Sequence, residues 1–408
     1  MSPHLSQQNL NSNHLPRPEN KLFYPAIDGL RAVAAILVFL QHYVLYRFNP
    51  IVTWGWTGVD IFFVLSGFLI TGILFDTQND PHRFRTFYIR RALRIFPLYF
   101  GVFLVALLTT PLFLWEWKPA SLLYPLYLGN YAQLFSPSAA REASQLFSLR
   151  LGQPLFLGHL WSLAVEEQFY FIWPCVVFIV RDRVRLLRIC GVVIVSSPVI
   201  RIIAVALASG QTMDTVLLTF TTLYRMDALL VGGAVALLLR GPAAARLKSR
   251  ALPAFWCLAG LLLISWVVAV KVLHQTSAGT LQTPWIVTVG STLVDLMSAS
   301  VLLLAIQPGS WFYRKLCYRP LRLLGQRSYG FYIFHYLLLP IYVRYLPYLI
   351  LPFTKHLTVG VIVLPFLCTV GLSFLSFRYF EAPFLRLKSR FAHPERSVER
   401  LPEPVQVS

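Results

Sequence analysis

Residues 29–47 read GLRAVAAILVFLQHYVLYR, an apolar run long enough to cross a bilayer as one helix. Arg31 and His42 interrupt this run eleven residues apart. That spacing is just over three helical turns, so both side chains share one face, about 16 Å apart along the axis. Ionisable residues inside a membrane are costly and indicate function. We therefore expect a long anionic ligand, held at one end near Arg31 and reacting at the other near His42.

Apolar runs of similar length recur along the chain. Of its 408 residues, 56% are hydrophobic and only 13% are charged, a balance that ordinary soluble domains do not show. The sequence therefore predicts an all-α polytopic membrane protein with about ten transmembrane helices. We place these spans near residues 29–47, 57–76, 95–115, 160–180, 187–208, 216–239, 252–270, 284–306, 328–348 and 356–377.

The distribution of basic residues predicts how these spans are oriented. The formal net charge is +19. Of the 36 lysines and arginines, 27 lie on one set of alternate connections and 7 on the other, with Arg201 and Arg225 inside spans. The positive-inside rule then puts both termini in the cytoplasm. Because topology accounts for the basic excess, no nucleic-acid partner is expected.

Three parts of the chain are expected. Residues 1–22 are a polar, disordered cytoplasmic tail, residues 23–390 are the membrane domain, and residues 391–408 are a second cytoplasmic tail. The largest connection, residues 116–158, faces outward. Its aromatic side chains form either an interfacial belt or a sugar-binding surface. The five cysteines have no metal-ligand or redox spacing, so no metal site is predicted.

His42 and Arg31 each allow two interpretations. His42 lies past the bilayer midplane, where it either packs by hydrogen-bonding a neighbouring helix or takes a proton from an acceptor hydroxyl as a general base. Apolar surroundings favour the neutral imidazole, the form that a base needs. Arg31 is either an ordinary positive-inside anchor or part of the same site. The face it shares with His42 favours the site.

The segment Tyr88-Ile89-Arg90-Arg91-Ala92-Leu93-Arg94 leads into the third span from the cytoplasm. Arg91 and Arg94 are three residues apart and so are neighbours on one helix face. Arginine binds phosphate oxygens in pairs of hydrogen bonds, which predicts a clamp for a phosphorylated cytoplasmic ligand. The alternative is topogenic charge or contact with anionic lipid.

Two adjacent carboxylates, Glu166 and Glu167, lie near the outer end of the fourth span. They point about 100° apart around a helix, so packing alone should not give both the same partner. At least one is expected to face a polar cavity or a basic partner such as Arg225. A buried ion pair joining spans four and six competes with a functional role for these residues.

Asp60 in the second span and His335 in the ninth are also ionisable. Each is expected to tie helices together rather than to react. Ser66 and Gly67 are small residues that allow close approach of another helix.

Taken together, these segments resemble one family. The Arg-x10-His of the first span, GVDIFFVLSGF at 58–68, FYIRRALRIFP at 87–97, WSLAVEEQFY at 161–170, and Ser328-Tyr329 ahead of His335 are similar to the acyltransferase-3 family of membrane O-acyltransferases. The resemblance covers roughly residues 23–388 in the family's order. Several motifs in the right order are far more specific than any one of them.

The resemblance implies a ten-span core in the bacterial inner membrane. It would move an acyl group, commonly acetyl, from cytoplasmic acyl-CoA to a hydroxyl of a glycan or glycolipid, such as a surface polysaccharide or lipopolysaccharide. The chain resembles the stand-alone type, without an extracytoplasmic esterase-like domain. Acyl-CoA would be a co-substrate, and no permanently bound cofactor is expected.

The resemblance also implies roles for individual residues. His42 would be the catalytic base and Arg31 its motif partner, while Arg91 and Arg94, with Arg90 beside them, would bind the donor. The pantetheine arm of coenzyme A is about as long as the separation between Arg31 and His42. The resemblance also implies catalytic roles for Glu166 and Glu167. A proton- or ion-coupled transporter is the alternative, since it too would carry intramembrane His, Glu and Arg.

Overall fold

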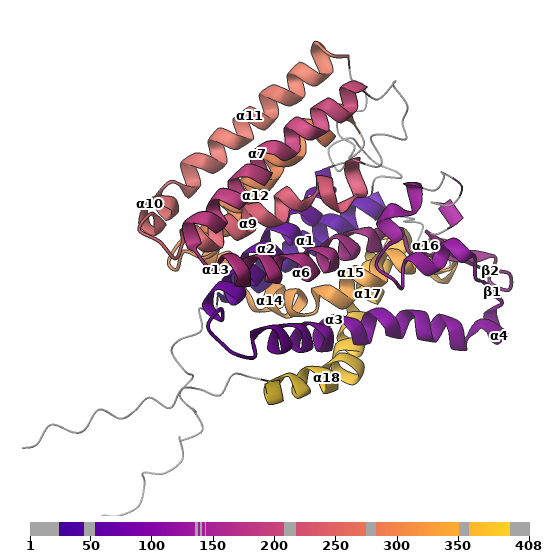
Figure 1. The fold of residues 1–408 in the computed structure, drawn as a ribbon. Coiled ribbons are helices and arrows are strands. Elements are labelled where there is room, and N and C mark those ends of the chain that lie inside the picture. The colour runs from indigo at the N-terminus through magenta and orange to yellow at the C-terminus, as the bar shows by residue number, and fades with distance from the viewer. Residues whose placement is uncertain are drawn as a thin grey trace, which may run out of the picture.

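The computed structural model describes residues 24–44, 54–134, 138, 141–142, 144–207, 218–274, 283–350 and 359–391. These residues form a helical bundle with one small sheet at one end (Figure 1). The predicted first tail, residues 1–22, lies outside the described residues, and so does the predicted second tail, residues 391–408, apart from Phe391, the last residue of a short 3-10 helix.

The elements are as follows. The helices are α1 Pro25–Val44, α2 Thr57–Asp76, α3 Arg83–Leu108, α4 Thr110–Phe113, α6 Trp161–Val180, α7 Arg183–Leu207, α9 Met226–Leu238, α10 Ala244–Ser249, α11 Ala251–Lys271, α12 Ser291–Ala305, α13 Trp311–Leu316, α14 Arg319–Gln326, α15 Ser328–Leu337, α16 Leu339–Ile350, α17 Leu364–Ser376 and α18 Ala382–Leu387. The strands are β1 Trp115–Glu116, β2 Gln145–Ser148 and β3 Gln153–Phe156. Short 3-10 helices include η2 Pro119–Leu123, η3 Gly129–Leu134, η5 Thr222–Tyr224 and η9 Lys388–Phe391, and π-helical turns occur at Ile286–Gly290, Val359–Val363 and Phe377–Glu381.

Eight helices of the described part are long and apolar enough to cross a membrane. This confirms the prediction of an all-α polytopic membrane protein. The sixth predicted span contains a shorter apolar helix, α9. The ninth is divided at Leu338 into α15 and α16. Pro340, the second residue of α16, explains the division, because proline lacks an N–H and its ring clashes with the preceding turn of a helix.

The third span differs in where it begins. Its helix, α3, starts at Arg83 rather than near residue 95. The basic segment before the apolar run is therefore helical, and Arg90, Arg91 and Arg94 lie on one continuous helix, in agreement with the helix face predicted for Arg91 and Arg94. The rigid helix fixes their spacing.

Glycines bring α2 and α9 into close contact at the centre of the bundle. A Cβ atom on Gly67 would lie 1.7 Å from the carbonyl oxygen of Leu229, and one on Gly232 would lie 1.9 Å from that of Val64. Only glycine allows backbones to approach this closely. The expectation that Gly67 permits close helix packing is confirmed.

The basic connections gather at one end of the bundle, called here the basic end. It carries α10, α13, α14 and the start of α3 (Figure 1). There the guanidinium of Arg240 makes two hydrogen bonds to the carboxylate of Asp76, at 2.7 and 2.5 Å. The assignment of this end to the cytoplasm stays a prediction from the positive-inside rule.

The opposite end, called here the sheet end, contains a feature that the sequence did not predict. Strands β1, β2 and β3 form an antiparallel sheet in that order. They have only two to four residues each, too few for an alternating pattern to be recognised. The same segment, 116–158, sends η2 and η3 against α3 and α6: the Tyr99 hydroxyl of α3 donates to the carbonyl of Tyr124 at 2.5 Å.

Candidate functional site

Three histidines lie together at the sheet-end side of α1. Nδ1 of His42 is 3.1 Å from Nε2 of His335, on α15. His159, just before α6, packs edge-on against His335 with ring centroids 5.4 Å apart. The ring of Tyr336 contacts both His42, at 4.3 Å, and His159, at 5.2 Å between centroids. Residues far apart in sequence thus form one cluster.

The hydrogen bonds of this cluster fix which ring nitrogens carry protons. Nδ1 of His335 lies 2.6 Å from the carbonyl oxygen of Tyr332, which can only accept, so this nitrogen must donate. A neutral His335 therefore has a lone pair at Nε2. His42 must then donate from Nδ1 to that lone pair. The remaining nitrogen of a neutral His42, Nε2, is left with a lone pair that can accept a proton.

His335 is held rigidly in this arrangement. Its side chain is almost fully buried, with 1% exposed. The hydroxyl of Tyr43 donates to its backbone carbonyl at 2.6 Å. The expectation that His335 ties helices together is confirmed, since it connects α15 to α1. The sequence did not predict that its partner would be His42.

A cavity of about 50 Å³ lies between α1, α2, α6 and α15. Arg31, Ser66, Glu166 and Tyr332 are among the residues that line it. The hydroxyl of Ser66 donates to Oε1 of Glu166 at 2.6 Å. Within the described residues no carboxylate forms an ion pair with Arg31. Arg31 thus presents an unpaired guanidinium to a cavity on the α1 side of the bundle.

Arg91 is the partner of both adjacent carboxylates. Its Nη2 is 3.7 Å from Oε2 of Glu166, and its Nε is 3.6 Å from Oε1 of Glu167. Its guanidinium also stacks on the ring of Tyr170, 3.6 Å from the centroid. The expectation that packing would not give Glu166 and Glu167 one partner is wrong, because the guanidinium presents donors along two edges and bridges the angle between them.

Arg94, one turn further along α3, is in a different environment. Its electrostatic neighbours include two cations, Arg31 and Arg91. Within the described residues neither Arg90 nor Arg94 forms an ion pair with a carboxylate. Of the three α3 arginines predicted to bind the anionic donor, Arg91 is therefore occupied by protein carboxylates, and Arg90 and Arg94 are not.

Lys388 adds a cation that the sequence interpretation missed. It begins η9, which packs against α3. Burial, together with repulsion from Arg94, Arg90, Arg91 and Arg31, lowers the pKa of Lys388 to about 8. A lysine placed among arginines is a position that an anionic ligand would stabilise. Only the return of the chain from α17 past α3 brings it there.

Tyr127 belongs to the outer segment but reaches the neighbourhood of Arg91. Its backbone adopts a positive φ of 56°, which is strained for a non-glycine residue. Gln168 holds its carbonyl with a 2.7 Å hydrogen bond, and its ring stacks on Tyr99 with centroids 4.2 Å apart. The Tyr127 hydroxyl is buried with no hydrogen-bond partner in the described part of the chain. Its electrostatic neighbours include Glu167 and Arg91.

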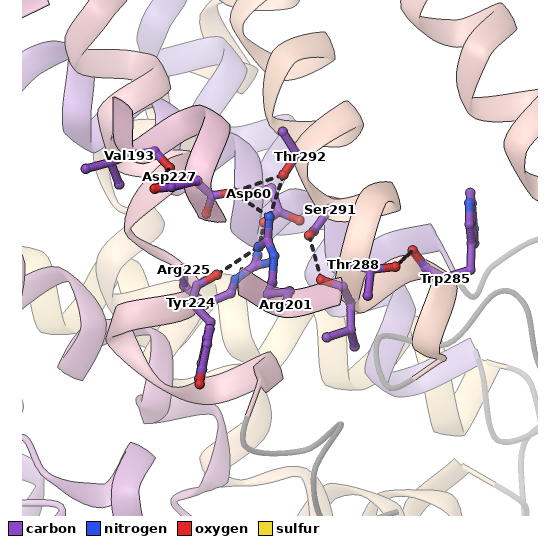
Figure 2. A network of polar contacts seen from close by, with 12 residues as sticks. Asp60, Val193, Arg201, Tyr224, Arg225, Asp227, Trp285, Thr288, Ser291 and Thr292 are labelled. Atoms are coloured by element: carbon purple, nitrogen blue, oxygen red, sulfur yellow. Dashed lines mark hydrogen bonds and ion pairs between the residues drawn. The ribbon is translucent and has the colours of Figure 1, made fainter. Parts of the chain in front are cut away.

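A second group of buried charges joins α2, α7, α9 and α12, as Figure 2 shows. Arg225 forms an ion pair with Asp60. Arg201 Nη2 lies 2.7 Å from Oδ2 of Asp227 and 2.5 Å from the hydroxyl of Thr292. These contacts pair charges that would be costly if buried alone, although Oδ2 of Asp60 and Oδ1 of Asp227 are buried with no hydrogen-bond partner in the described part of the chain.

This group corrects one expectation and confirms another. Arg225 was expected to be available to Glu166 or Glu167, but Asp60 occupies it. The helix packing places Asp60 on the side of α2 that meets the start of α9. The prediction that Asp60 ties helices together is therefore confirmed.

Comparisons with known proteins identify a family and several curated relatives. The model of the acyltransferase domain family matches residues 24–378. YrhL of Bacillus subtilis (strain 168), whose assignment as a peptidoglycan O-acetyltransferase is provisional, is 30% identical over 384 residues, which cover 90% of this chain and 56% of YrhL.

Two further relatives carry related names. The peptidoglycan O-acetyltransferase OatA of Listeria monocytogenes is 28% identical over 373 residues, covering 89% of this chain and 56% of OatA. The O-acetyltransferase OatA of Staphylococcus aureus is 29% identical over 366 residues, covering 88% of this chain and 57% of that OatA. The chain thus spans little more than half the length of these curated relatives. No solved structure matches it.

Proposed function

This chain belongs to the acyltransferase-3 family, and we propose that it transfers an acyl group, in the first instance acetyl, from acyl-CoA to a hydroxyl of a cell-envelope glycan. The observation that carries the proposal is the alignment along α1. An unpaired cation, Arg31, faces a cavity, and about 16 Å further along the helix His42 has a lone pair at Nε2.

The donor would bind from the basic end. Its phosphates match the unpaired cations Arg31, Arg90, Arg94 and Lys388, since guanidinium and ammonium groups are strong partners for phosphate oxygens. Its pantetheine arm, with two amides, would run through the cavity beside Arg31. The arm is long enough for the thioester to reach His42 while the nucleotide stays at the basic end. Glu166 and Glu167 would hold Arg91 in place and line this path.

The transfer itself needs one base. The acceptor hydroxyl would give its proton to Nε2 of His42 as its oxygen attacks the thioester carbonyl. The carbon–oxygen bond forms, the carbon–sulfur bond breaks, and the proton passes from His42 to the departing thiolate of coenzyme A. His335 would hold His42 in the tautomer that this step requires. The base returns to its starting form at the end of each turnover.

The acceptor would approach from the sheet end. Two relatives are named as peptidoglycan O-acetyltransferases, one of them provisionally, which makes peptidoglycan the first glycan to test. The outer segment, 116–158, contacts the histidine cluster, since Phe156 of β3 packs on Tyr336 with centroids 5.3 Å apart. The relatives are acetyltransferases, so they give the transporter alternative no support, and it is not carried forward.

The experiment uses purified protein in detergent or nanodiscs with isotope-labelled acetyl-CoA and soluble peptidoglycan fragments. We expect release of coenzyme A thiol and an equal amount of acetyl ester on the glycan, detected by mass spectrometry. Folded His42→Gln protein is the control for non-enzymatic transfer. Folded wild-type protein that neither binds acetyl-CoA nor releases thiol would contradict the proposal. Thiol release without glycan ester would reject only this acceptor.

A further inference from the structure

A cavity separate from the proposed reaction site is lined in part by α11. This helix lies at the edge of the bundle (Figure 1). The volume of the cavity is about 280 Å³. The lining comes from α7, α9, α10, α11 and α12 and is apolar, apart from Ser300 and Arg250. The hydroxyl of Ser300 already donates to the carbonyl of Leu296 at 3.2 Å. The walls therefore offer no free polar group except Arg250.

Small side chains create this space. Ala251, Ala254 and Leu258 form one stripe of α11 facing the cavity, and Ala299 of α12 lies among the residues opposite. The other faces of α11 expose large apolar side chains, such as Trp256 at 67% and Ile264 at 62%. Such faces suit a lipid environment. The cavity thus lies between a lipid-facing helix and the core.

An apolar cavity of this size is unfavourable both when it is filled with water and when it is empty. Water enters only where it finds two or more polar partners, and an engineered apolar cavity of about 150 Å³ stays dry and binds benzene. An empty cavity forfeits the dispersion contacts of its lining atoms. A hydrocarbon chain restores those contacts without any polar partner.

Arg250 indicates which head group the hydrocarbon chain in this cavity would carry. It lies between α10 and α11 at the basic end, with its side chain exposed. Within the described residues no carboxylate forms an ion pair with it. Arg246 and Lys248 of α10 precede it by four and two residues. Basic pockets at helix ends on the cytoplasmic side bind anionic lipid head groups.

The dimensions also agree with one lipid leaflet. From Arg250 to Leu258 the helix rises about 12 Å. Half of the hydrocarbon core of a bilayer is about 15 Å thick. A phosphate at Arg250 would therefore place its acyl chain along the whole apolar stripe of α11.

We propose that this cavity is a binding site for an anionic phospholipid, with one acyl chain between α11 and the pair α9 and α12 and the head-group phosphate on Arg250. The lipid would fix α11 against α12, which also carries Thr292 of the buried ionic group in Figure 2. The site needs no acyl transfer, so its test is independent of the proposed function.

The test is native mass spectrometry of delipidated, detergent-purified full-length protein, titrated with phosphatidylglycerol and, separately, with phosphatidylcholine. We expect one phosphatidylglycerol to bind more tightly than phosphatidylcholine. Ala254→Trp fills the cavity and should abolish this adduct. Arg250→Gln should lower the affinity for phosphatidylglycerol about fivefold, to the level of phosphatidylcholine, because one basic side chain near a head group contributes about that much.

Matched controls separate the cavity from the general surface. Cys257→Trp adds the same bulk to an exposed position of α11, and Arg314→Gln removes an exposed cation from α13 at the same end. Both should leave the adduct unchanged. Equal binding of the two lipids by wild type, or an adduct that survives in folded Ala254→Trp protein, would overturn the proposal. If Ala254→Trp does not fold, Ala299→Leu provides the same test from the opposite wall.

Discussion

Nδ1 of His42 lies 3.1 Å from Nε2 of His335, although 293 residues separate them in the sequence. Nδ1 of His335 must donate to the carbonyl oxygen of Tyr332. The direction of the hydrogen bond between His42 and His335 is therefore fixed as well. The nitrogen left free on His42 is the one that can accept a proton. The pair thus resembles a base held by an orienting group, with a backbone carbonyl in the place of a carboxylate.

Removing the base should abolish transfer without abolishing folding. For His42→Gln we expect transfer to fall by about 10²–10⁴-fold, the usual contribution of a positioned general base. Glutamine can keep one hydrogen bond to His335 but cannot take the proton at neutral pH. Acetyl-CoA binding, measured by calorimetry on monodisperse protein, should persist. Appreciable transfer by this variant would move the base elsewhere, to Glu166 in the first instance.

His335 should act through His42 rather than on the substrate. For His335→Ala we expect a lower kcat, by up to about 10²-fold, because His42 loses its fixed orientation. Donor affinity should stay near the wild-type value. His335→Gln, whose side-chain oxygen can still accept from Nδ1 of His42, should recover part of the rate. A purely structural role predicts instead that activity per folded molecule is the same in both variants.

The two arginines of α3 should separate stability from donor binding. Arg91→Ala leaves Glu166 and Glu167 without their cation. We expect it to lower the free energy of unfolding by about 2–3 kcal/mol. Breaking a fully buried pair typically costs about 3–5 kcal/mol, and these side chains are 12–17% exposed.

Arg94→Ala breaks no ion pair in the described residues, so it should fold normally and lose acetyl-CoA affinity. The expected loss is about 1.5–3 kcal/mol, the size of one charge-assisted hydrogen bond. Thermal unfolding and calorimetric titration on both variants provide the measurement. If both substitutions change the stability and the donor affinity equally, then the two arginines and the two carboxylates act as one unit.

Donor affinity should depend on pH through Lys388. Its lowered pKa, about 8, means that it is charged below pH 8 and loses its proton as the pH rises through that value. A polyanionic donor favours the charged form, so affinity should be highest near pH 7 and fall towards pH 9.5. Lys388→Met should be weak throughout and show no such fall. Arg378→Met, at an exposed position of the π-helical turn Phe377–Glu381, should keep the wild-type pH profile.

Close packing of α2 against α9 should make Gly67 intolerant of any side chain. A Cβ there would lie 1.7 Å from a backbone carbonyl, so one of the helices must move. We expect Gly67→Ala to cost at least about 3 kcal/mol, the upper part of the range for overpacking. Gly371→Ala, on α17 with nothing within 4 Å of the added atom, is the control and should be neutral. Similar unfolding temperatures for both variants would contradict this packing.

The helical membrane fold was predictable from the sequence because its signals are local. An apolar run of about twenty residues specifies a spanning helix wherever it occurs. The shared face of Arg31 and His42 follows from the helical period alone. The motifs around Asp60, Arg91 and Glu166 are sufficient to identify the family, whose model matches residues 24–378. The roles assigned to these residues stay predictions.

Partner choice was decided only by the tertiary structure. Glu166 and Glu167 contact Arg91 instead of Arg225, and Lys388 lies among the α3 arginines. No periodicity within one helix contains this information. A buried charge pairs with whichever opposite charge the packing of other helices brings within about 4 Å, and that packing depends on glycines and bulky side chains spread over the entire chain.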